Sequence, residues 1–213
     1  MGRLAYYERM KLLAREKRAQ HGTVTAHFGL REIRAIYKQE GITVDLWKLP
    51  ATIRAVYMCD GDDPSVLVNR GLPTEPRLFA MVHELKHHYV DRSIIERGGM
   101  RCGDYNANQM LEIGAEVFAA EFIYPEAEFR DCLNQLGIAA AEWTPETVVL
   151  LKRSCGARVS YRFLQKRLER HGIIPRNAFA GVQFQKLEEE IYGPPIYKQE
   201  WFKAARARKY GKN

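Results

Sequence analysis

The sequence has no long hydrophobic run. None of its 213 residues belongs to a stretch near the roughly 20 apolar residues that a transmembrane helix needs. The first residues also lack the apolar core of a signal peptide. We therefore expect a cytoplasmic protein with no membrane partner. Internal repeats and low-complexity linkers are absent as well, and the length suits one domain or a domain with a smaller appendage.

Cysteine is scarce and widely spaced. The four cysteines form no C-x-x-C pair, and they are Cys59, Cys102, Cys132 and Cys155. Their even number is compatible with two disulfides, but a chain without an export signal favours free thiols. Structural zinc sites usually draw on closely spaced cysteines, so we do not expect one here.

Acidic residues are few at the two ends of the chain. Residues 1–22 carry six Lys or Arg against two Glu, and residues 195–213 carry six against one. The ends thus contribute +9, and the residues between them −2, to the formal net charge of +7. Basic ends can contact phosphates or an acidic partner. Simple solvation of exposed termini explains them more economically.

The most informative motif is H-E-x-x-H at residues 83–87. On a helix, residues four apart share a face, so His83 and His87 can present ring nitrogens to one point. Two neutral imidazoles are good zinc ligands, and a zinc with one open position activates water. Glu84 can take a proton from that water. The motif indicates metal-assisted hydrolysis, most often of a peptide bond.

The residues around the motif favour a buried helix over residues 75–91. Leu78, Val82 and Leu85 recur at helical spacing and would bury one side. Pro76 falls in the first turn, where its missing N–H has no cost. This context is less compatible with the alternative, in which the histidines only face water.

A catalytic zinc usually takes three protein ligands and one water. Residues 107–123 predict a second helix, with an apolar stripe formed by Leu111, Ala115, Phe118 and Phe122. Glu112 and Glu116 adjoin this stripe, where charged groups are uncommon unless they are paired or bind a metal. We interpret Glu112 as the third ligand and Glu116 as an acceptor for the outer N–H of a ligating histidine. The alternative is a solvated helix edge.

Two segments follow a known pattern. Residues 77–87 contain the H-E-x-x-H motif, and residues 112–125 are similar to E-x-x-A-x-x-F-A-x-x-L-x-x-P. Together they resemble the ImmA/IrrE family of metallopeptidases, and Val159-Ser160 followed by Arg167-Leu168 is similar to a further segment of that family. The resemblance covers roughly residues 30–172 and is thin outside the two site helices.

The resemblance implies a zinc endopeptidase with one zinc ion per chain and Glu112 as third ligand. It also implies a protein substrate, typically a helix-turn-helix repressor that is cut to derepress genes. In thermolysin-like peptidases, which the chain also resembles, one acidic residue follows the second histidine by four and another follows the ligand glutamate by four. Asp91 and Glu116 stand at these positions and are expected to support the ligands. Two imidazoles and a carboxylate suit manganese or iron too.

The chain departs from the family at two positions. Lys86 stands where the family commonly has glycine, and we expect its side chain to point away from the metal and to be tolerated. Asp91 replaces a frequent histidine, which leaves the donor to the transition state open. Tyr105, Tyr89 and His88 are candidates, although each is more typical of a structural residue.

The pattern predicts an α+β fold, with a small twisted β-sheet packed on a zincin-like site of two helices and a helical C-terminal extension. Strands are expected at residues 43–47, 53–58 and 65–69, the last two forming a hairpin. We expect the 65–69 strand to line the cleft as a sheet edge. The predicted units are a metallopeptidase domain (1–136), a helical, helix-turn-helix-like subdomain (137–194) and a basic tail (195–213).

Residues 150–171 hold seven Lys or Arg and one Glu. A helix, a turn at residues 156–158 and a second helix from Ser160 resemble a helix-turn-helix. Arg158, Arg162 and Lys166 are possible contacts to DNA or a partner. We favour bracing of the catalytic domain or docking of a repressor. The alternative function is a DNA- or partner-binding regulator in which the metal site is only structural.

Overall fold

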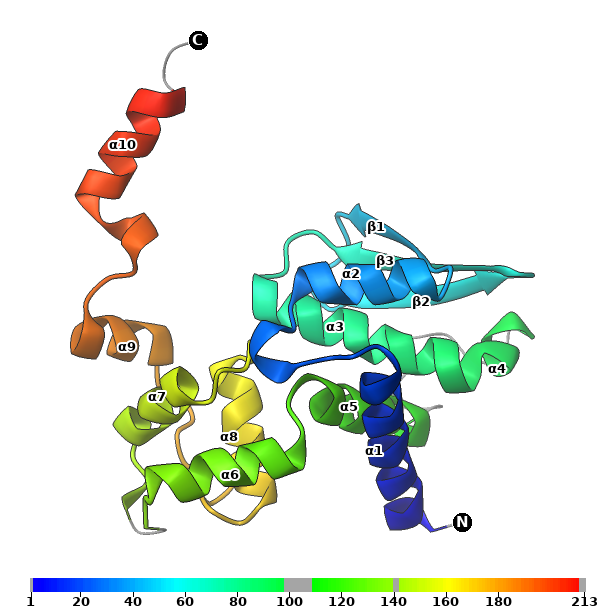
Figure 1. The fold of residues 1–213 in the computed structure, drawn as a ribbon, viewed down its shortest axis with the longest axis horizontal. Helices are drawn as coiled ribbons and strands as arrows, with labels where there is room; N and C mark the ends of the chain where they lie inside the picture. The colour runs from blue at the N-terminus through cyan, green and yellow to red at the C-terminus, as the bar shows by residue number, and fades with distance from the viewer. Residues whose placement is uncertain (1, 98–108, 140–141, 211–213) are drawn as a thin grey trace.

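A computed structural model gives the structure of residues 2–97, 109–139 and 142–210. Helices and a small sheet alternate in the first half of the chain, and helices alone follow (Figure 1). The strands are β1 (Thr43–Trp47), β2 (Ala55–Asp60) and β3 (Asp63–Asn69). The α-helices are α1 (Arg3–Gln20), α2 (Leu30–Gln39), α3 (Thr74–Lys86), α4 (Arg92–Glu96), α5 (Gln109–Ile123), α6 (Glu126–Leu136), α7 (Pro145–Ser154), α8 (Tyr161–Arg170), α9 (Phe184–Tyr192) and α10 (Glu200–Tyr210). Two short 3₁₀ turns, η1 (Thr25–His27) and η4 (Ile196–Lys198), and a π-helical segment, η2 (His87–Asp91), complete the elements.

The sheet has the strand order β1-β3-β2. β1 runs parallel to β3, and β2 pairs with β3 as an antiparallel hairpin, with Tyr57 opposite Val66. Val66 and Val68 are fully buried because α2 and α3 lie together along one face of the sheet (Figure 1). The predicted α+β class and the predicted hairpin are both confirmed.

The prediction that the 65–69 strand forms a free sheet edge was wrong. β3 pairs with β1 on one side and β2 on the other, so it is the central strand. The hairpin pattern fixed the β2–β3 pairing but carried no information on which strand β1 would join. The strand that reaches the site is β2, because the backbone N–H of Tyr57 donates to Oε2 of Glu84 on α3 at 2.9 Å.

Helix α5 lies between α3 and α1. Leu78, Val82 and Leu85 of α3 are fully buried, as the helical spacing predicts. On the other side, α1 approaches so closely that a Cβ at Gly114 would lie 2.6 Å from a ring carbon of Tyr6. Glycine at this position therefore lets α1 cover the helix that carries Glu112.

One cluster of buried apolar side chains extends from Met10 in α1 to Phe184 in α9. Arg167 of α8 adds polar contacts to α5: its guanidinium donates to the carbonyl of Tyr124 and forms an ion pair with Glu121 at 3.3 Å. Helix α8 is thus bonded directly to the helix that supplies Glu112. The division into units at residues 136/137 and 194/195 stays a prediction.

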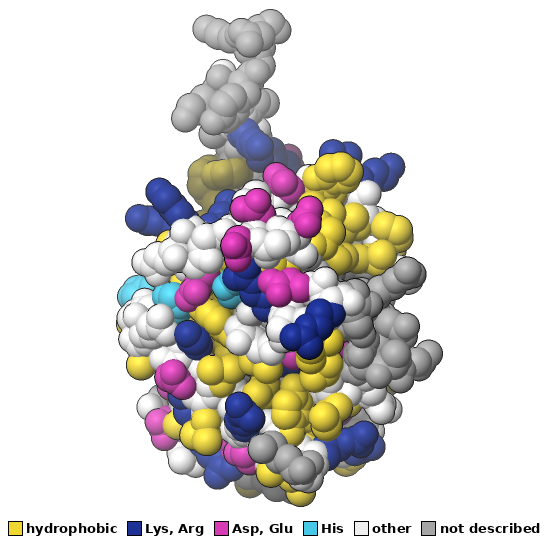
Figure 2. Space-filling view, turned by 90° about the vertical axis from the view of Figure 1, so that its right-hand side faces the viewer, with side chains coloured by type: hydrophobic (Ala, Val, Ile, Leu, Met, Phe, Trp, Pro, Cys, Tyr) yellow, Lys and Arg dark blue, Asp and Glu magenta, His cyan; other side chains and the backbone are white. Residues whose placement is uncertain are grey.

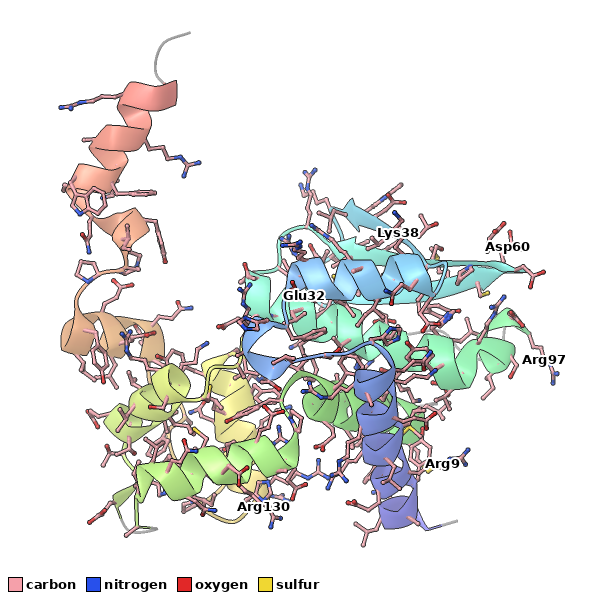
Figure 3. All side chains as sticks on the ribbon, viewed as in Figure 1. Arg9, Glu32, Lys38, Asp60, Arg97 and Arg130 are labelled. Carbon is pink, nitrogen blue, oxygen red and sulfur yellow. The ribbon has the colours of Figure 1, made fainter. Side chains whose placement is uncertain are left out.

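Helix α10 lies apart from the body at the C-terminal end (Figure 1). Arg9 of α1 and Arg130 of α6 lie at the opposite side and point outward (Figure 3). The end of the molecule formed by the β2–β3 turn and α4 mixes acidic, basic and apolar side chains (Figure 2). Among the described residues, no helix has both the length and the apolar character needed to cross a bilayer. Cys59, Cys132 and Cys155 are free thiols, and Cys102 lies outside the described residues.

Candidate metal centre

His83, His87 and Glu112 converge on one point. His83 Nε2 lies 3.2 Å from His87 Nε2 and 3.1 Å from Glu112 Oε2, and His87 Nε2 lies 3.8 Å from Glu112 Oε1. One ligand atom from each residue lies within 4.8 Å of the other two. The structure therefore brings together the three residues that the sequence predicts as ligands.

The packing of α3 against α5 brings the ligands together. His87 and Glu112 have side-chain exposures of 0% and 2%, whereas His83 keeps 12%. The cluster is thus closed on the protein side and open toward solvent at His83. A hydrolytic site needs this arrangement, because ligands must be fixed while water and substrate enter.

Asp91 fixes the orientation of His87. Its Oδ2 lies 2.6 Å from His87 Nδ1. Because a carboxylate oxygen accepts, Nδ1 carries the hydrogen and donates a hydrogen bond to Asp91. The lone pair of His87 is then on Nε2, which faces His83. Burial alone would raise the pKa of Asp91, but the hydrogen bonds and charges of His87 and Lys86 outweigh it and lower that pKa. The structure thus places Asp91 against His87, and its role as a support of a metal ligand stays a prediction.

Glu84 is buried, with 2% exposure, beside the first histidine. Its Oε2 accepts the Tyr57 N–H from β2, which holds the carboxylate in one orientation. The sequence could not reveal this contact, because a backbone N–H leaves no residue-type signal. A fixed carboxylate next to a metal ligand is suited to proton transfer.

The acidic neighbours of His83 raise its pKa. Burial would lower the pKa of His83, but the hydrogen bond that His83 donates to Glu112 and the charges of Glu84, Glu112 and Glu116 together raise it. Glu116 is therefore near enough to act on His83 electrostatically. Its role as a hydrogen-bond acceptor for a ligand stays a prediction.

The full burial of Lys86 was not evident from the sequence. The side chain is fully buried, and Nζ lies 2.5 Å from Asp91 Oδ2 and 3.1 Å from the carbonyl oxygen of Leu111. Whether the position tolerates this lysine stays a prediction, but its contact with Asp91 depends on the π-helical segment η2, which follows it. The replacement of the family's glycine by lysine was the only signal in the sequence.

Two of the three candidate donors to the transition state, Tyr89 and His88, form hydrogen bonds with residues other than the three candidate ligands. The Tyr89 hydroxyl donates to Glu40 Oε1 at 2.8 Å and lies 3.0 Å from His21 Nε2. His88 Nδ1 lies 3.1 Å from the Tyr57 hydroxyl. These contacts join α1, α2 and β2, which is a structural use of both side chains. Their role as donors stays a prediction, and Tyr105 lies outside the described residues.

The basic side chains of residues 150–171 divide into two groups. Lys152 pairs with Glu75, Arg153 pairs with Glu188, and Arg167 is buried against α5. These contacts brace α7 and α8 against the body or against α9. The second group is exposed and consists of the predicted contact residues Arg158, Arg162 and Lys166, together with Arg170. Arg158 also lies against Gly29, where an added Cβ would meet its guanidinium.

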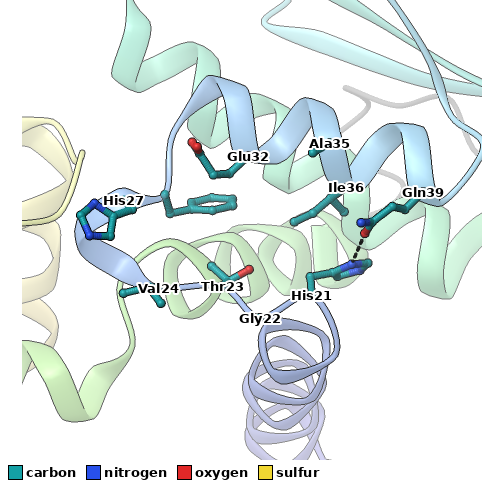
Figure 4. Close-up of a pocket in the computed structure, with 10 residues that line it drawn as sticks. His21, Gly22, Thr23, Val24, His27, Glu32, Ala35, Ile36 and Gln39 are labelled. Atoms are coloured by element: carbon teal, nitrogen blue, oxygen red, sulfur yellow. Dashed lines mark hydrogen bonds between the residues drawn. The ribbon is translucent and has the colours of Figure 1, made fainter.

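A shallow pocket of about 230 Å³ lies between the end of α1 and helix α2 (Figure 4). Its polar side chains are those of His21, Thr23, His27, Glu32 and Gln39, and His21 Nδ1 lies 2.9 Å from Gln39 Oε1. None of the three converging ligands lines it. This pocket is separate from the candidate metal centre.

The donor set fits a tetrahedral zinc site. Three donors that each lie about 2.0–2.1 Å from a zinc ion are separated from one another by about 3.3 Å. The separations of 3.2 Å between the two Nε2 atoms and 3.1 Å between His83 Nε2 and Glu112 Oε2 are close to this value, and His87 Nε2 lies 3.8 Å from the other carboxylate oxygen, Oε1. Two imidazoles and one carboxylate from two packed helices, with an adjacent buried glutamate, define a candidate metallopeptidase centre.

The comparison with known families agrees with this class. Residues 39–169, which are 131 of the 213 residues, match the IrrE N-terminal-like domain of the peptidase M78 family. The chain belongs to this family of metallopeptidases. The match covers the sheet, both site helices and the helix pair α7–α8. No curated protein matches the chain.

Proposed function

We propose that the chain is a zinc-dependent endopeptidase that hydrolyses a peptide bond in a protein substrate. The observation that carries the proposal is the convergence of His83, His87 and Glu112 within 4.8 Å, beside the buried Glu84. His83, His87 and Glu112 would hold the ion. A zinc ion bound there polarises the scissile carbonyl and lowers the pKa of water.

The protein's own groups would supply the proton transfers. The Glu84 carboxylate takes a proton from the attacking water and passes it to the leaving amine as the C–N bond breaks. The Tyr57 N–H keeps this carboxylate oriented. Asp91 keeps the proton of His87 on Nδ1, so that Nε2 can bind the metal.

For the substrate we propose a helix-turn-helix transcriptional repressor in the cytoplasm. The family supports a protein substrate in general terms, and the narrower choice depends on the resemblance to ImmA/IrrE. The exposed Arg158, Arg162 and Lys166 offer a basic surface on which such a protein could dock. Direct binding of DNA by this surface is the alternative function. The buried and paired members of the same basic segment favour bracing and docking instead.

The test compares Glu84→Gln with the wild type. Metal content is measured in both proteins, and cleavage of a proteome-derived peptide library is followed by mass spectrometry of new N-termini. The variant should keep its metal while the rate falls about 10²- to 10⁴-fold, as expected for loss of a general base. Glu75→Gln, at the start of the same helix, is the matched control and should keep full activity. Cleavage that survives in Glu84→Gln, or a wild type that binds no divalent metal, would refute the proposal.

A further inference from the structure

Lys86 is the least expected side chain near the metal centre. It is fully buried, and an ammonium removed from water is costly unless nearby groups compensate its charge. Among the residues that the structure describes, two such groups lie next to Nζ. They are the Asp91 carboxylate, at 2.5 Å, and the carbonyl oxygen of Leu111, at 3.1 Å.

The first contact reaches the metal ligands through Asp91. Oδ2 of Asp91 is shared, because it accepts from Lys86 Nζ at 2.5 Å and from His87 Nδ1 at 2.6 Å. In a regular α-helix, with about 3.6 residues per turn, residues five apart point in different directions. The π-helical segment His87–Asp91 contains one extra residue in its turn and brings Asp91 under both Lys86 and His87.

The second contact reaches the other helix. Leu111 directly precedes Glu112, so its carbonyl belongs to the same turn of α5 as the third ligand. Tyr6 of α1 closes a further side, with its ring centroid 5.9 Å from Nζ. A single ammonium thus contacts the carboxylate that orients His87 and the backbone that carries Glu112.

We propose that Lys86 is a positioning residue of the metal centre, which holds Asp91 against His87 and ties both to the start of α5. It thereby sets the separation between the histidine pair on one helix and Glu112 on the other. This inference rests on the proposed metal site, but it adds a determinant of metal affinity that lies outside the ligand set.

The test measures metal binding without any substrate. Lys86→Met keeps an unbranched side chain, one atom shorter, and removes its charge. The variant should bind Zn²⁺ about 10- to 100-fold more weakly in competition with a chromophoric chelator, as seen when the partners of metal ligands are removed. The visible absorption of the Co²⁺-loaded protein should change in position or intensity, because the ligand geometry changes. Lys152→Met, which removes another lysine paired with a residue of α3, should change neither readout.

The Asp91→Asn variant and the double variant Lys86→Met/Asp91→Asn show whether Lys86 acts on the metal ligands through Asp91. If Lys86 acts through Asp91, Lys86→Met should weaken Zn²⁺ binding little further once Asp91 is replaced. Independent losses that add in the double variant would overturn the proposal. If Lys86→Met does not fold, Lys86→Gln, which keeps a donor without the charge, takes its place in the same cycle.

The outcomes separate this inference from the proposed function. A wild type that binds neither Zn²⁺ nor Co²⁺ refutes the metal site itself. A wild type that binds both, with a Lys86→Met variant of unchanged affinity and spectrum, refutes only the positioning role. A lower Tm of the metal-free variant with unchanged metal affinity would show a purely structural lysine, and it also overturns the proposal.

Discussion

Helix α5 buries two glutamates, Glu112 near its start and Glu121 near its end. Their side chains have nearly equal exposures of 2% and 1%. Burial therefore does not distinguish them, and neither does residue type. They differ in the groups that face them, and that difference separates a candidate ligand from a brace.

Glu121 faces permanent cations. Arg15 Nε of α1 donates to its Oε1 at 2.7 Å, and Arg167 of α8 pairs with its Oε2 at 3.3 Å. The backbone N–H of Glu126 adds a third bond at 3.1 Å. Because arginine stays charged, this end of α5 is neutralised within the fold and ties α1, α5 and α8 together.

Among its described neighbours, Glu112 faces two imidazoles, at 3.1 and 3.8 Å. Imidazole is neutral in its unprotonated form, and in that form it presents a lone pair that suits a metal ion. A carboxylate beside two such lone pairs offers the kinds of donor that a divalent metal ion binds. A buried glutamate is thus distinguished as a candidate ligand by the chemistry of its neighbours and not by its burial.

The largest expected effect separates the two glutamates by metal affinity. Glu112→Gln should weaken Zn²⁺ binding by more than the roughly 10- to 100-fold that removal of an outer partner costs, because a ligand itself is lost. Glu121→Gln should leave the Zn²⁺ dissociation constant unchanged. Competition titration of both variants measures the difference. Equal affinities in the two variants would contradict the assignment of Glu112.

The second effect concerns stability, and here Glu121 is the residue whose replacement should matter. Glu121→Gln leaves Arg167 buried beside a neutral amide, and breaking a buried ion pair in this way should cost about 3 kcal/mol. Urea unfolding of the metal-free protein measures the loss. Arg153→Gln, which breaks an ion pair between partly exposed side chains, is the control and should cost about 1 kcal/mol or less. If Glu121→Gln were as stable as the control, the ion pair of Glu121 with Arg167 would not stabilise the packing of α8 on α5.

The sequence was sufficient where local chemistry decides. The H-E-x-x-H spacing placed His83 and His87 on one face, and the apolar stripe placed Glu112 at the packing surface of its helix. The strand at residues 43–47 has the predicted bounds. Each of these features depends on periodicity within one element, so one segment of sequence was enough to define it.

The sequence was insufficient where two distant segments meet. The position of β3 at the centre of the sheet depends on its pairing with β1, in which Thr43 lies opposite Ser65, 22 residues later in the chain. The burial of Lys86 depends on a π-helical turn and on the Leu111 carbonyl of another helix. The Tyr57 N–H that holds Glu84 has no side-chain signature. Such contacts emerge only from tertiary packing.

The smallest expected effect concerns Glu126, the first residue of α6, and is measured as a dependence of stability on acid pH. Glu126 pairs with Lys11 of α1 and Arg130 of α6. Burial would raise the pKa of Glu126, but the hydrogen bonds from Lys11 and Arg130 outweigh it and lower that pKa to about 2. The folded pKa lies below the unfolded value of about 4.5, so the carboxylate stabilises the fold above pH 4.5 and loses this contribution as the pH falls toward 2.

Glu126→Gln should therefore have a lower Tm than the wild type at pH 7, and the gap should narrow steadily between pH 5 and pH 3. Because the carboxylate is partly exposed, the gap should correspond to about 1 kcal/mol or less. Thermal unfolding of the metal-free proteins at several pH values measures it. Glu142→Gln is the control and should show a smaller change with pH, because the exposed Glu142 carboxylate accepts only the backbone N–H of Ala139 among its described contacts. A gap for Glu126→Gln that stays constant down to pH 3 would show that the pairs with Lys11 and Arg130 do not stabilise this end of α5.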